Sequence, residues 1–196
     1  MINKVRTSTI IANKNISNAI KISNLISTEY YKTEITKDIN GVEVLGAIKN
    51  IYAMLIGASQ GLSGIKLNKK IRYKYFHNTS SYLFKNALYE MELFTKKMNG
   101  QPGTAYSLAG LGDLYVSVAG GRNSKMGYYL GKGKIYSSII KKQMRNITVE
   151  GCDLVFEVGS LILKNFKKQD FPIMLALITA ILKNKNNVGI LICGTG

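Results

Sequence analysis

The first 36 residues carry short apolar runs that are separated by polar turns. Residues 8–13, STIIAN, are rich in β-branched side chains and predict a strand. Apolar residues then recur at helical spacing from Ile16 to Leu25, which predicts an amphipathic helix that ends at Ser27. Residues 29–36 predict a second strand. The segment is therefore interpreted as one βαβ unit, with nothing on either side of it to complete a sheet.

Beyond Asp38 the pattern changes to apolar repeats at helical spacing, separated by glycine-rich turns. Asp38 or Asn40 can cap the first of these helices. The predicted helices, of which three are short or mixed in pattern, cover residues 41–57, 80–98, 104–108, 126–130, 135–143, 152–166 and 171–182. The chain is thus predicted to be mainly α-helical, with a helical domain over residues 41–183 and a frayed tail over 184–196.

The composition is that of a folded protein. Apolar residues make up 46 % of the 196 residues and charged residues 19 %, which excludes a disordered tail. The apolar runs are too short or are interrupted, by Glu43 and Lys49 in the longest case, so no membrane-spanning helix is expected. No secretory signal follows Met1, and the cytoplasm is the expected location. Two cysteines and one histidine are too few for a disulfide framework or a zinc site, so no metal is expected.

The chain is strongly basic. Its 27 Lys and Arg residues against 11 Asp and Glu residues give a net charge of +16, which suits phosphate-bearing partners but does not choose among nucleic acid, lipid head groups and small anions. Frequent Lys and Asn without Trp are typical of an AT-rich genome, and this bias is the preferred explanation. Aromatic and basic residues around His77 could stack on single-stranded nucleic acid. One short cluster is weak support, so a basic helical nucleic-acid-binding protein is the most distant alternative and no nucleic-acid partner is expected.

Lys49 is the first residue that resists a purely structural interpretation. It lies two turns into the first long helix, among the apolar neighbours Leu45, Ile48 and Tyr52. A lysine in such a place must reach solvent, pair with an acid or lose hydration, and a dehydrated ammonium group gives up its proton more easily and can act as an acid or a base. From the pattern alone, a narrow solvent-facing stripe shared with Asn50 is the preferred interpretation.

A second candidate is the glycine-rich stretch from Gly110 to Ser124. Its glycines allow tight turns and a close approach of the backbone to an anion. Arg122 offers a planar fork for phosphate, Asn123 offers an amide, and Asp113 can accept hydrogen bonds from hydroxyl groups. A pair of ordinary turns explains these residues about as well as a ligand-binding loop does.

Taken together, these residues resemble a known family. GVEVLGAIKNIYA at residues 41–53 resembles the start of the C-terminal domain of NAD(P)-dependent glycerol-3-phosphate dehydrogenases, and SLAGLGDL at 107–114 with GRN at 121–123 resembles its substrate loop. Shorter matches follow in the family's order at residues 78–79, 90–91, 130–133, 149–151 and 172–173. The resemblance implies an all-α domain of the 6-phosphogluconate dehydrogenase-like type, preceded over residues 1–40 by a βαβ remnant of a Rossmann domain.

The resemblance also implies a reaction, the oxidation of sn-glycerol 3-phosphate by NAD or NADP to dihydroxyacetone phosphate, and leaves a homodimer open. Lys49 would accept and donate the proton at the carbinol oxygen, with Asn50 beside it. Asp113 would help to hold the substrate and the lysine. Ser117 stands where the family usually has a threonine, and would offer its hydroxyl to the substrate.

The remaining implied site residues concern the phosphate and the cofactor. Arg122 and Asn123 would bind the substrate phosphate, next to a helix that is predicted to start at Ser124. Arg122 would also touch the cofactor, and Glu150 would contact the nicotinamide side of the dinucleotide. Whether that dinucleotide is NAD or NADP stays open.

The start of the chain departs from the family. The resemblance implies a preceding Rossmann half with a glycine fingerprint, whereas no GxGxxG follows a strand here. GYYLGK at residues 127–132 is one residue short of a Walker A loop and is interpreted as a turn. The segment from Ser63 to His77 is longer and more basic than the family's usual link. The chain is therefore expected to be a C-terminal fragment or a truncated gene product that is inactive alone, and a non-catalytic remnant is the alternative function.

Overall fold

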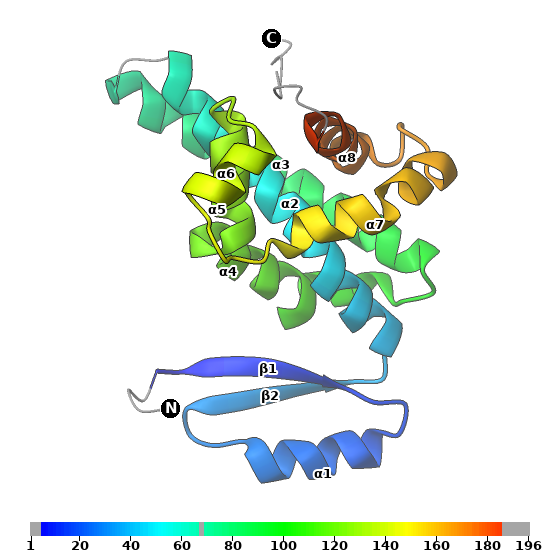
Figure 1. Cartoon of the computed structure of the whole chain (residues 1–196). Helices are drawn as coiled ribbons and strands as arrows, with labels where there is room; N and C mark the ends of the chain where they lie inside the picture. Colours follow the sequence, from blue (N-terminus) through cyan, green and yellow to red (C-terminus); the bar gives the residue numbers. More distant parts are fainter. Residues whose placement is uncertain (1–4, 67–68, 186–196) are drawn as a thin grey trace.

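The chain begins with the predicted βαβ unit, seen in a computed structural model that describes residues 5–66 and 69–185. Strand β1 (Thr7–Ala12), helix α1 (Ile16–Ile26) and strand β2 (Tyr31–Thr36) differ from the predicted bounds by no more than two residues. The two strands pair in parallel, with Thr7 opposite Tyr31 and Ala12 opposite Thr36. Helix α1 covers the face of this sheet that points away from the helical body (Figure 1).

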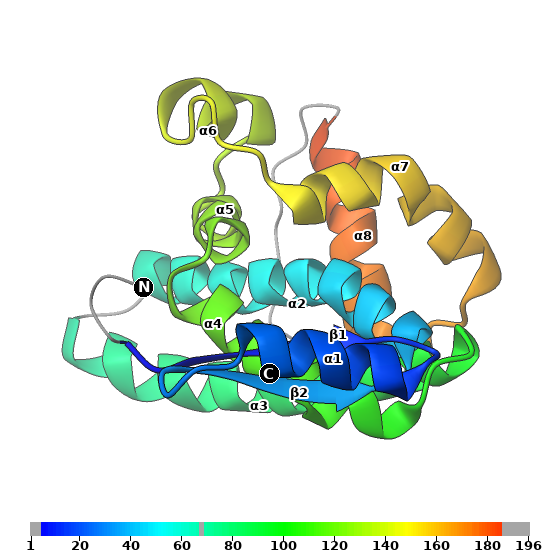
Figure 2. The same ribbon diagram turned by 90° about the horizontal axis from the view of Figure 1, so that it is seen from below.

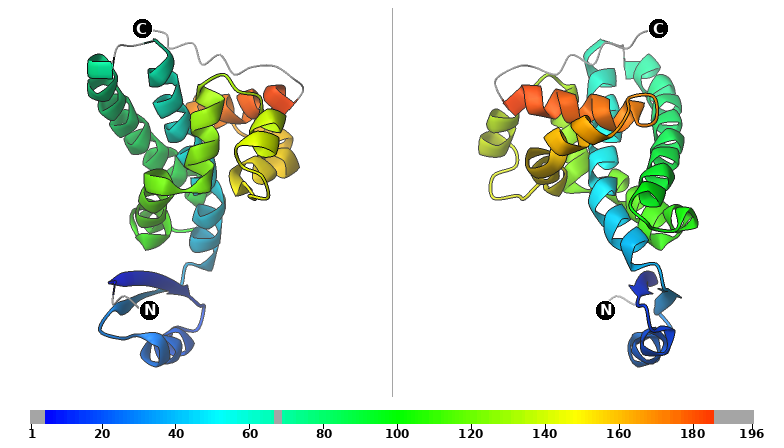
Figure 3. Two further views of the ribbon diagram at one scale, coloured as in Figure 1. Left: turned by 60° about the vertical axis from the view of Figure 1, so that its left-hand side comes forward. Right: turned by 90° about the vertical axis from the view of Figure 1, so that its right-hand side faces the viewer.

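The rest of the described chain is helical. Helix α2 lies between α3 on one side and the α7–α8 pair on the other (Figures 2 and 3). The elements are α2 (Ile39–Lys66), α3 (Lys69–Lys97), the 3₁₀ helix η1 (Pro102–Tyr106), the π-helical turn η2 (Leu108–Gly112), α4 (Asp113–Gly120), α5 (Arg122–Gly131), α6 (Tyr136–Lys142), α7 (Glu150–Asn165) and α8 (Pro172–Lys185). This arrangement confirms the predicted fold class, mainly α-helical with a short βαβ unit at the start.

Several predicted helix bounds are wrong. Helix α2 continues nine residues beyond Gly57, and α3 begins at Lys69 rather than at Ser80, so these helices take up the described part of the long basic segment. The helix expected over residues 104–108 is split between η1 and η2. The predicted tail over 184–196 lies outside the described residues, apart from the last two residues of α8. Apolar periodicity misses these ends because tertiary packing, more than intrinsic propensity, stabilises protein helices.

Helices α2 and α5 touch backbone to backbone through glycines. A Cβ atom at Gly127 would lie 1.8 Å from the carbonyl oxygen of Met54, and one at Gly131 would lie 2.0 Å from that of Ala58. Helix α2 contributes glycines to the same contact, because Gly57 and Gly61 lie against the backbone of α5. Residues 127–131 therefore belong to α5, with Gly127 and Gly131 on the face that packs against α2, and only Lys132 lies in a turn. The interpretation of this segment as a turn is wrong for all but its last residue. The crossing places the start of α5 beside the middle of α2.

Helix α2 is strongly apolar, although the charged residues Glu43 and Lys49 lie within it. By length and composition its stretch Ile39–Leu62 could cross a bilayer, contrary to the expectation from the sequence. However, 61 % of its most apolar window is buried inside the protein. Leu45 and Tyr52, for example, are fully buried in the hydrophobic core. The apolar character of α2 is thus explained by its central position in the helical body.

Two buried acids fasten the ends of helices. Glu90 on α3 is 2 % exposed and accepts hydrogen bonds from the backbone N–H groups of Ile173 (2.8 Å) and Met174 (2.9 Å) at the start of α8. Tyr52 of α2 donates its hydroxyl to the same carboxylate at 3.1 Å. Burial raises the pKa of the Glu90 carboxyl above its ordinary value, although these three hydrogen bonds act against the rise. Glu90 thereby joins α2, α3 and α8 at one point.

The second buried acid, Asp38, lies where the βαβ unit meets the helical body. Its carboxylate accepts from the backbone N–H groups of Gly41 and Gln101, both at 2.9 Å, and from the hydroxyl of Thr104 at 2.6 Å. Asp38 therefore caps α2, as one of the two predicted caps, and ties it to η1. Burial by itself would raise the pKa of Asp38, but the three hydrogen bonds outweigh it and hold the pKa below its ordinary value of 3.8.

Replacing Asp38 by asparagine should lower the free energy of unfolding by about 1–3 kcal/mol at neutral pH, because charge-assisted hydrogen bonds and a helix cap are weakened. The folded carboxyl has the lower pKa, so the unfolded chain takes up a proton first and the contribution of Asp38 is lost as pH falls below 3.8. Urea unfolding across this pH range should show the wild type approaching the variant in stability. The exposed Glu34→Gln change is the control, and equal losses for both variants at neutral pH would contradict the role of Asp38.

Candidate functional site

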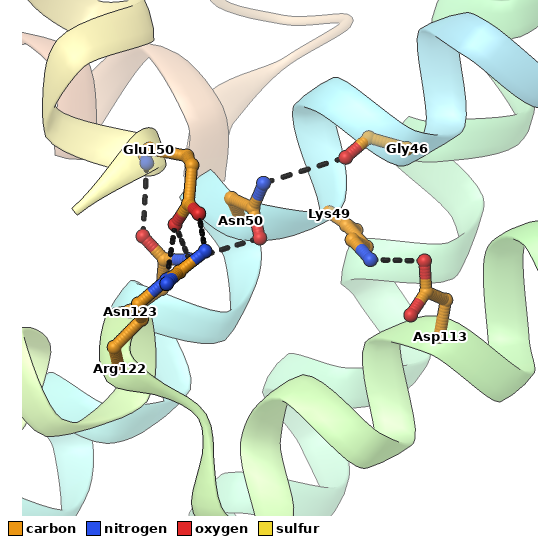
Figure 4. Close-up of polar contacts among 8 residues, drawn as sticks. Gly46, Lys49, Asn50, Asp113, Arg122, Asn123 and Glu150 are labelled. Carbon is orange, nitrogen blue, oxygen red and sulfur yellow. Dashed lines mark hydrogen bonds and ion pairs between the residues drawn. The ribbon is translucent and has the colours of Figure 1, made fainter. Parts of the chain in front are cut away.

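Lys49 and Asp113 form an ion pair between α2 and α4. The Lys49 ammonium group donates to the Oδ2 atom of Asp113, which is the first residue of α4 (Figure 4). The Lys49 side chain is 15 % exposed and that of Asp113 is 42 % exposed. The pattern alone favoured a narrow solvent-facing stripe shared with Asn50, whereas Lys49 is largely buried and paired with an acid. The structure instead joins two candidates that the sequence singled out separately, 64 positions apart.

A second polar group is built around Asn123, whose side chain is buried. Asn123 donates its amide to Oδ1 of Asn50 at 2.9 Å and to Oε2 of Glu150 at 3.2 Å. Its own Oδ1 atom accepts the backbone N–H of Gly151 at 2.8 Å (Figure 4). Because Lys49 and Asn50 are neighbours on α2, this helix carries one member of each polar group.

Arg122 and Glu150 make a two-point ion pair at the edge of this group. The Arg122 Nε atom donates to Oε2 of Glu150 at 2.8 Å, and its Nη2 atom donates to Oε1 (Figure 4). Both side chains are accessible to solvent, with exposed fractions of 54 % for Arg122 and 37 % for Glu150. Such a fork geometry matches a carboxylate and equally matches a phosphate group.

Local backbone structure brings two helix starts to this place. Gly121 is extended (φ −71°, ψ 154°), so α5 begins at Arg122 and the predicted start at Ser124 is wrong. Helix α7 begins at Glu150, the partner of Arg122. Neither start has a side-chain hydrogen bond from its capping residue. The first backbone N–H groups of both helices, and the positive ends of both dipoles, therefore favour negative charge here.

An open cleft of about 580 Å³ runs beside the Lys49–Asp113 pair. Strand β1 forms one wall, with Ser8 and Thr9, and α2 contributes Gly46. Asp113 lines the opposite side together with the residues of η2 that precede it. The cleft thus lies between the βαβ unit and the helical body, where a small ligand can reach the carboxylate that holds Lys49.

Ser117 and Gly151 lie close to the two polar groups. Ser117 lies one turn beyond Asp113 on α4, half-buried, and in the described part of the chain its hydroxyl makes no hydrogen bond to the other candidates. Gly151 belongs to the short family match at residues 149–151, which assigned it no role. A Cβ atom there would lie 2.9 Å from Oδ1 of Asn123 and from the backbone oxygen of Asn50, so the position suits a glycine. The only feature of the sequence that pointed to Gly151 was its position directly after the candidate Glu150.

Comparison with known proteins assigns this chain to a family. A family model described as "NAD-dependent glycerol-3-phosphate dehydrogenase C-terminus" matches residues 38–192. A glycerol-3-phosphate dehydrogenase [NAD(P)+] of Leptospira biflexa is 33 % identical over 163 residues, which are 82 % of this chain and 45 % of the relative. An NADP(+)-dependent glycerol-3-phosphate dehydrogenase of Archaeoglobus fulgidus is 32 % identical over 130 residues, 66 % of this chain and 37 % of that protein.

Solved structures agree on the fold. A glycerol-3-phosphate dehydrogenase of Saccharomyces cerevisiae superimposes with a TM-score of 0.77 at 22 % identity. The match covers 92 % of this chain and 52 % of the yeast chain. One from Coxiella burnetii gives 0.72 at 24 % identity, over 95 % of this chain and 52 % of its own. The chain thus spans about half the length of the proteins it matches. From the match over residues 38–192, we conclude that this chain belongs to the family of C-terminal domains of NAD-dependent glycerol-3-phosphate dehydrogenases.

Proposed function

We propose that the chain is the substrate-binding half of a dehydrogenase that interconverts sn-glycerol 3-phosphate and dihydroxyacetone phosphate, and that it works in the cytoplasm. The observation that carries this proposal is the convergence of a lysine–aspartate pair and an arginine–asparagine group from α2, α4, α5 and α7. Membership of the family supports the same reaction. A non-catalytic remnant is the alternative, and activity measurements on a completed enzyme distinguish the two.

Lys49 is the proposed acid and base. Oxidation of a secondary alcohol removes a hydride from carbon and a proton from oxygen, and the Lys49 Nζ atom takes that proton and returns it in the reverse reaction. Asp113 holds the Nζ atom in place through the ion pair and faces the cleft, where it also accepts a hydrogen bond from a substrate hydroxyl. Ser117, on the same side of α4, is a proposed contact to the substrate.

Arg122 and Asn123 are the proposed phosphate anchor. The guanidinium group offers two parallel N–H donors, and the positive end of α5 lies at the same place. Asn123 is already oriented by Gly151 and Asn50, so little freedom is lost when its amide meets a ligand. Asn50, which follows Lys49 directly, links the phosphate end of the site to the reacting end.

In the part of the chain that the structure describes, the residues fit only one end of a dinucleotide. Arg122 and Glu150 can contact the nicotinamide side of NAD or NADP, which would supply the hydride acceptor. The turn after β1, Asn13–Asn15, contains no glycine and does not fit a pyrophosphate. We propose that residues 1–40 are the end of a Rossmann domain and that residues 41–183 are the substrate domain. A two-stranded parallel sheet is not stable alone and needs further strands, which supports this division.

Replacing Arg122 by lysine should weaken the binding of sn-glycerol 3-phosphate by about ten- to a hundredfold, because charge is kept but the two-point fork is lost. Weak binding of unphosphorylated glycerol should stay unchanged. NMR titration of the 196-residue chain and of its variant measures the affinity for each of the two ligands. Equal losses for glycerol and its phosphate would show that Arg122 supports the fold instead, and the phosphate-anchor role would then be withdrawn.

A further inference from the structure

We propose that Glu150 is an internal counter-ion that occupies the phosphate position on Arg122, so that a substrate phosphate binds by displacing this carboxylate. The inference rests on the proposed function, because it takes Arg122 as the phosphate anchor. It adds a device that controls how strongly that anchor binds.

The geometry around the carboxylate is that of a bound anion. Glu150 receives two donors from the guanidinium fork of Arg122, at Nε (2.8 Å) and Nη2, and a third from the Asn123 amide at 3.2 Å. A phosphate group would use these same donors in the same arrangement. The donors cannot serve both anions at full strength, so the carboxylate and a phosphate compete.

The surroundings of the carboxylate favour an anion whichever group supplies it. The ion pair lies at the starts of α5 and α7, where both helix dipoles are positive. Neither capping residue supplies a side-chain hydrogen bond, and in the first turn of α7 Asn123 accepts the N–H of Gly151. Glu150 belongs to the first turn of α7, so it carries its charge to this place as part of the fold. In the ligand-free chain the anchor is therefore neutralised from within.

Glu150 can leave without disturbing the rest of the site. Its side chain and that of Arg122 are exposed to solvent by 37 % and 54 %, so the carboxylate can turn outward into water. Asn123 would stay in place, because Gly151 and Asn50 hold it independently of Glu150. An exposed ion pair contributes little to stability, so displacement lowers phosphate affinity only a few-fold. The released carboxylate is then free to face a second ligand.

The test is a titration of the 196-residue chain with inorganic phosphate and with sn-glycerol 3-phosphate, followed by NMR. Glu150→Gln should bind both ligands roughly two- to fivefold more tightly than the wild type, because the competing charge is gone. Glu150→Asp keeps the charge but is too short to hold the fork at two points, so it should also bind more tightly. Glu157→Gln removes an exposed charge from the same helix and should change nothing.

The outcomes separate this inference from the proposed function. If Arg122→Ala abolishes binding while both Glu150 variants bind like the wild type, the displacement of Glu150 is wrong and the phosphate anchor stands. If Glu150→Asp binds like the wild type while Glu150→Gln and Glu157→Gln both bind more tightly, net charge alone explains the gain and the inference also fails. If Arg122→Ala binds like the wild type, or no variant binds phosphate, the proposed site itself is wrong. Thermal unfolding of each variant checks that it is folded.

Discussion

Replacing Lys49 by methionine should lower the turnover number of a completed enzyme by about 10²- to 10⁴-fold, the range for removal of a general acid or base. Methionine keeps the length and apolar stem of lysine but cannot carry a proton. The Michaelis constant should change much less, because the proposed phosphate anchor, Arg122 with Asn123, is untouched. The measurement is NADH or NADPH oxidation in the presence of dihydroxyacetone phosphate, by this chain joined to the part of the Leptospira biflexa relative that it does not match.

Two controls accompany the Lys49 measurement. Lys96→Met removes an exposed lysine near the end of α3 and should leave turnover unchanged. The 196-residue chain alone should show no turnover, because nothing in its described part fits a pyrophosphate and a misplacement of about 1 Å can cost a hundredfold. Turnover by the chain alone that Lys49→Met abolishes would refute the need for a separate cofactor domain. A completed Lys49→Met enzyme with near-normal turnover would refute the role of Lys49.

Replacing Gly127 by alanine should destabilise the fold by about 3 kcal/mol or more, at the upper end of the usual cost of overpacking a core. The added Cβ would lie 1.8 Å from the Met54 carbonyl oxygen, a backbone atom that cannot turn away. Helices α2 and α5 would have to move apart, and the Asn123–Asn50 hydrogen bond would be strained with them. Urea unfolding measures the stability, and titration with sn-glycerol 3-phosphate should show weaker binding.

Gly46→Ala is the matched control for Gly127. Gly46, like Gly127, lies inside a helix, but its added Cβ would meet nothing within 4 Å. Alanine is the better helix former by about 1 kcal/mol, so this variant should be as stable as the wild type or slightly more stable. If the two variants unfold at the same urea concentration, the close glycine contact between α2 and α5 is not essential.

The sequence alone predicted the elements whose signals are local. Alternating β-branched runs around an amphipathic helix identified the βαβ unit, and apolar periodicity identified most of the helices. Asp38 was recognised as one of two caps because a cap requires only an acceptor three residues ahead of a free N–H group. For the site, residue chemistry pointed to Asp113, Arg122 and Asn123, and it singled out Lys49 while favouring a solvent-facing position for it. The resemblance gave Lys49 its proposed role and added Asn50, Ser117 and Glu150.

Tertiary structure decided which of these residues meet. Periodicity reports which side of a helix is apolar, but not which distant helix covers it, so the pattern favoured solvent for Lys49 where the fold supplies Asp113. The role of the glycines in GYYLGK depends on the crossing of α2 and α5, which no local pattern reports. Likewise, the pairing of Arg122 with Glu150 depends on two helix starts that are 28 residues apart. Contacts of this kind come from packing between helices, and packing depends on the whole chain rather than on any local stretch of it.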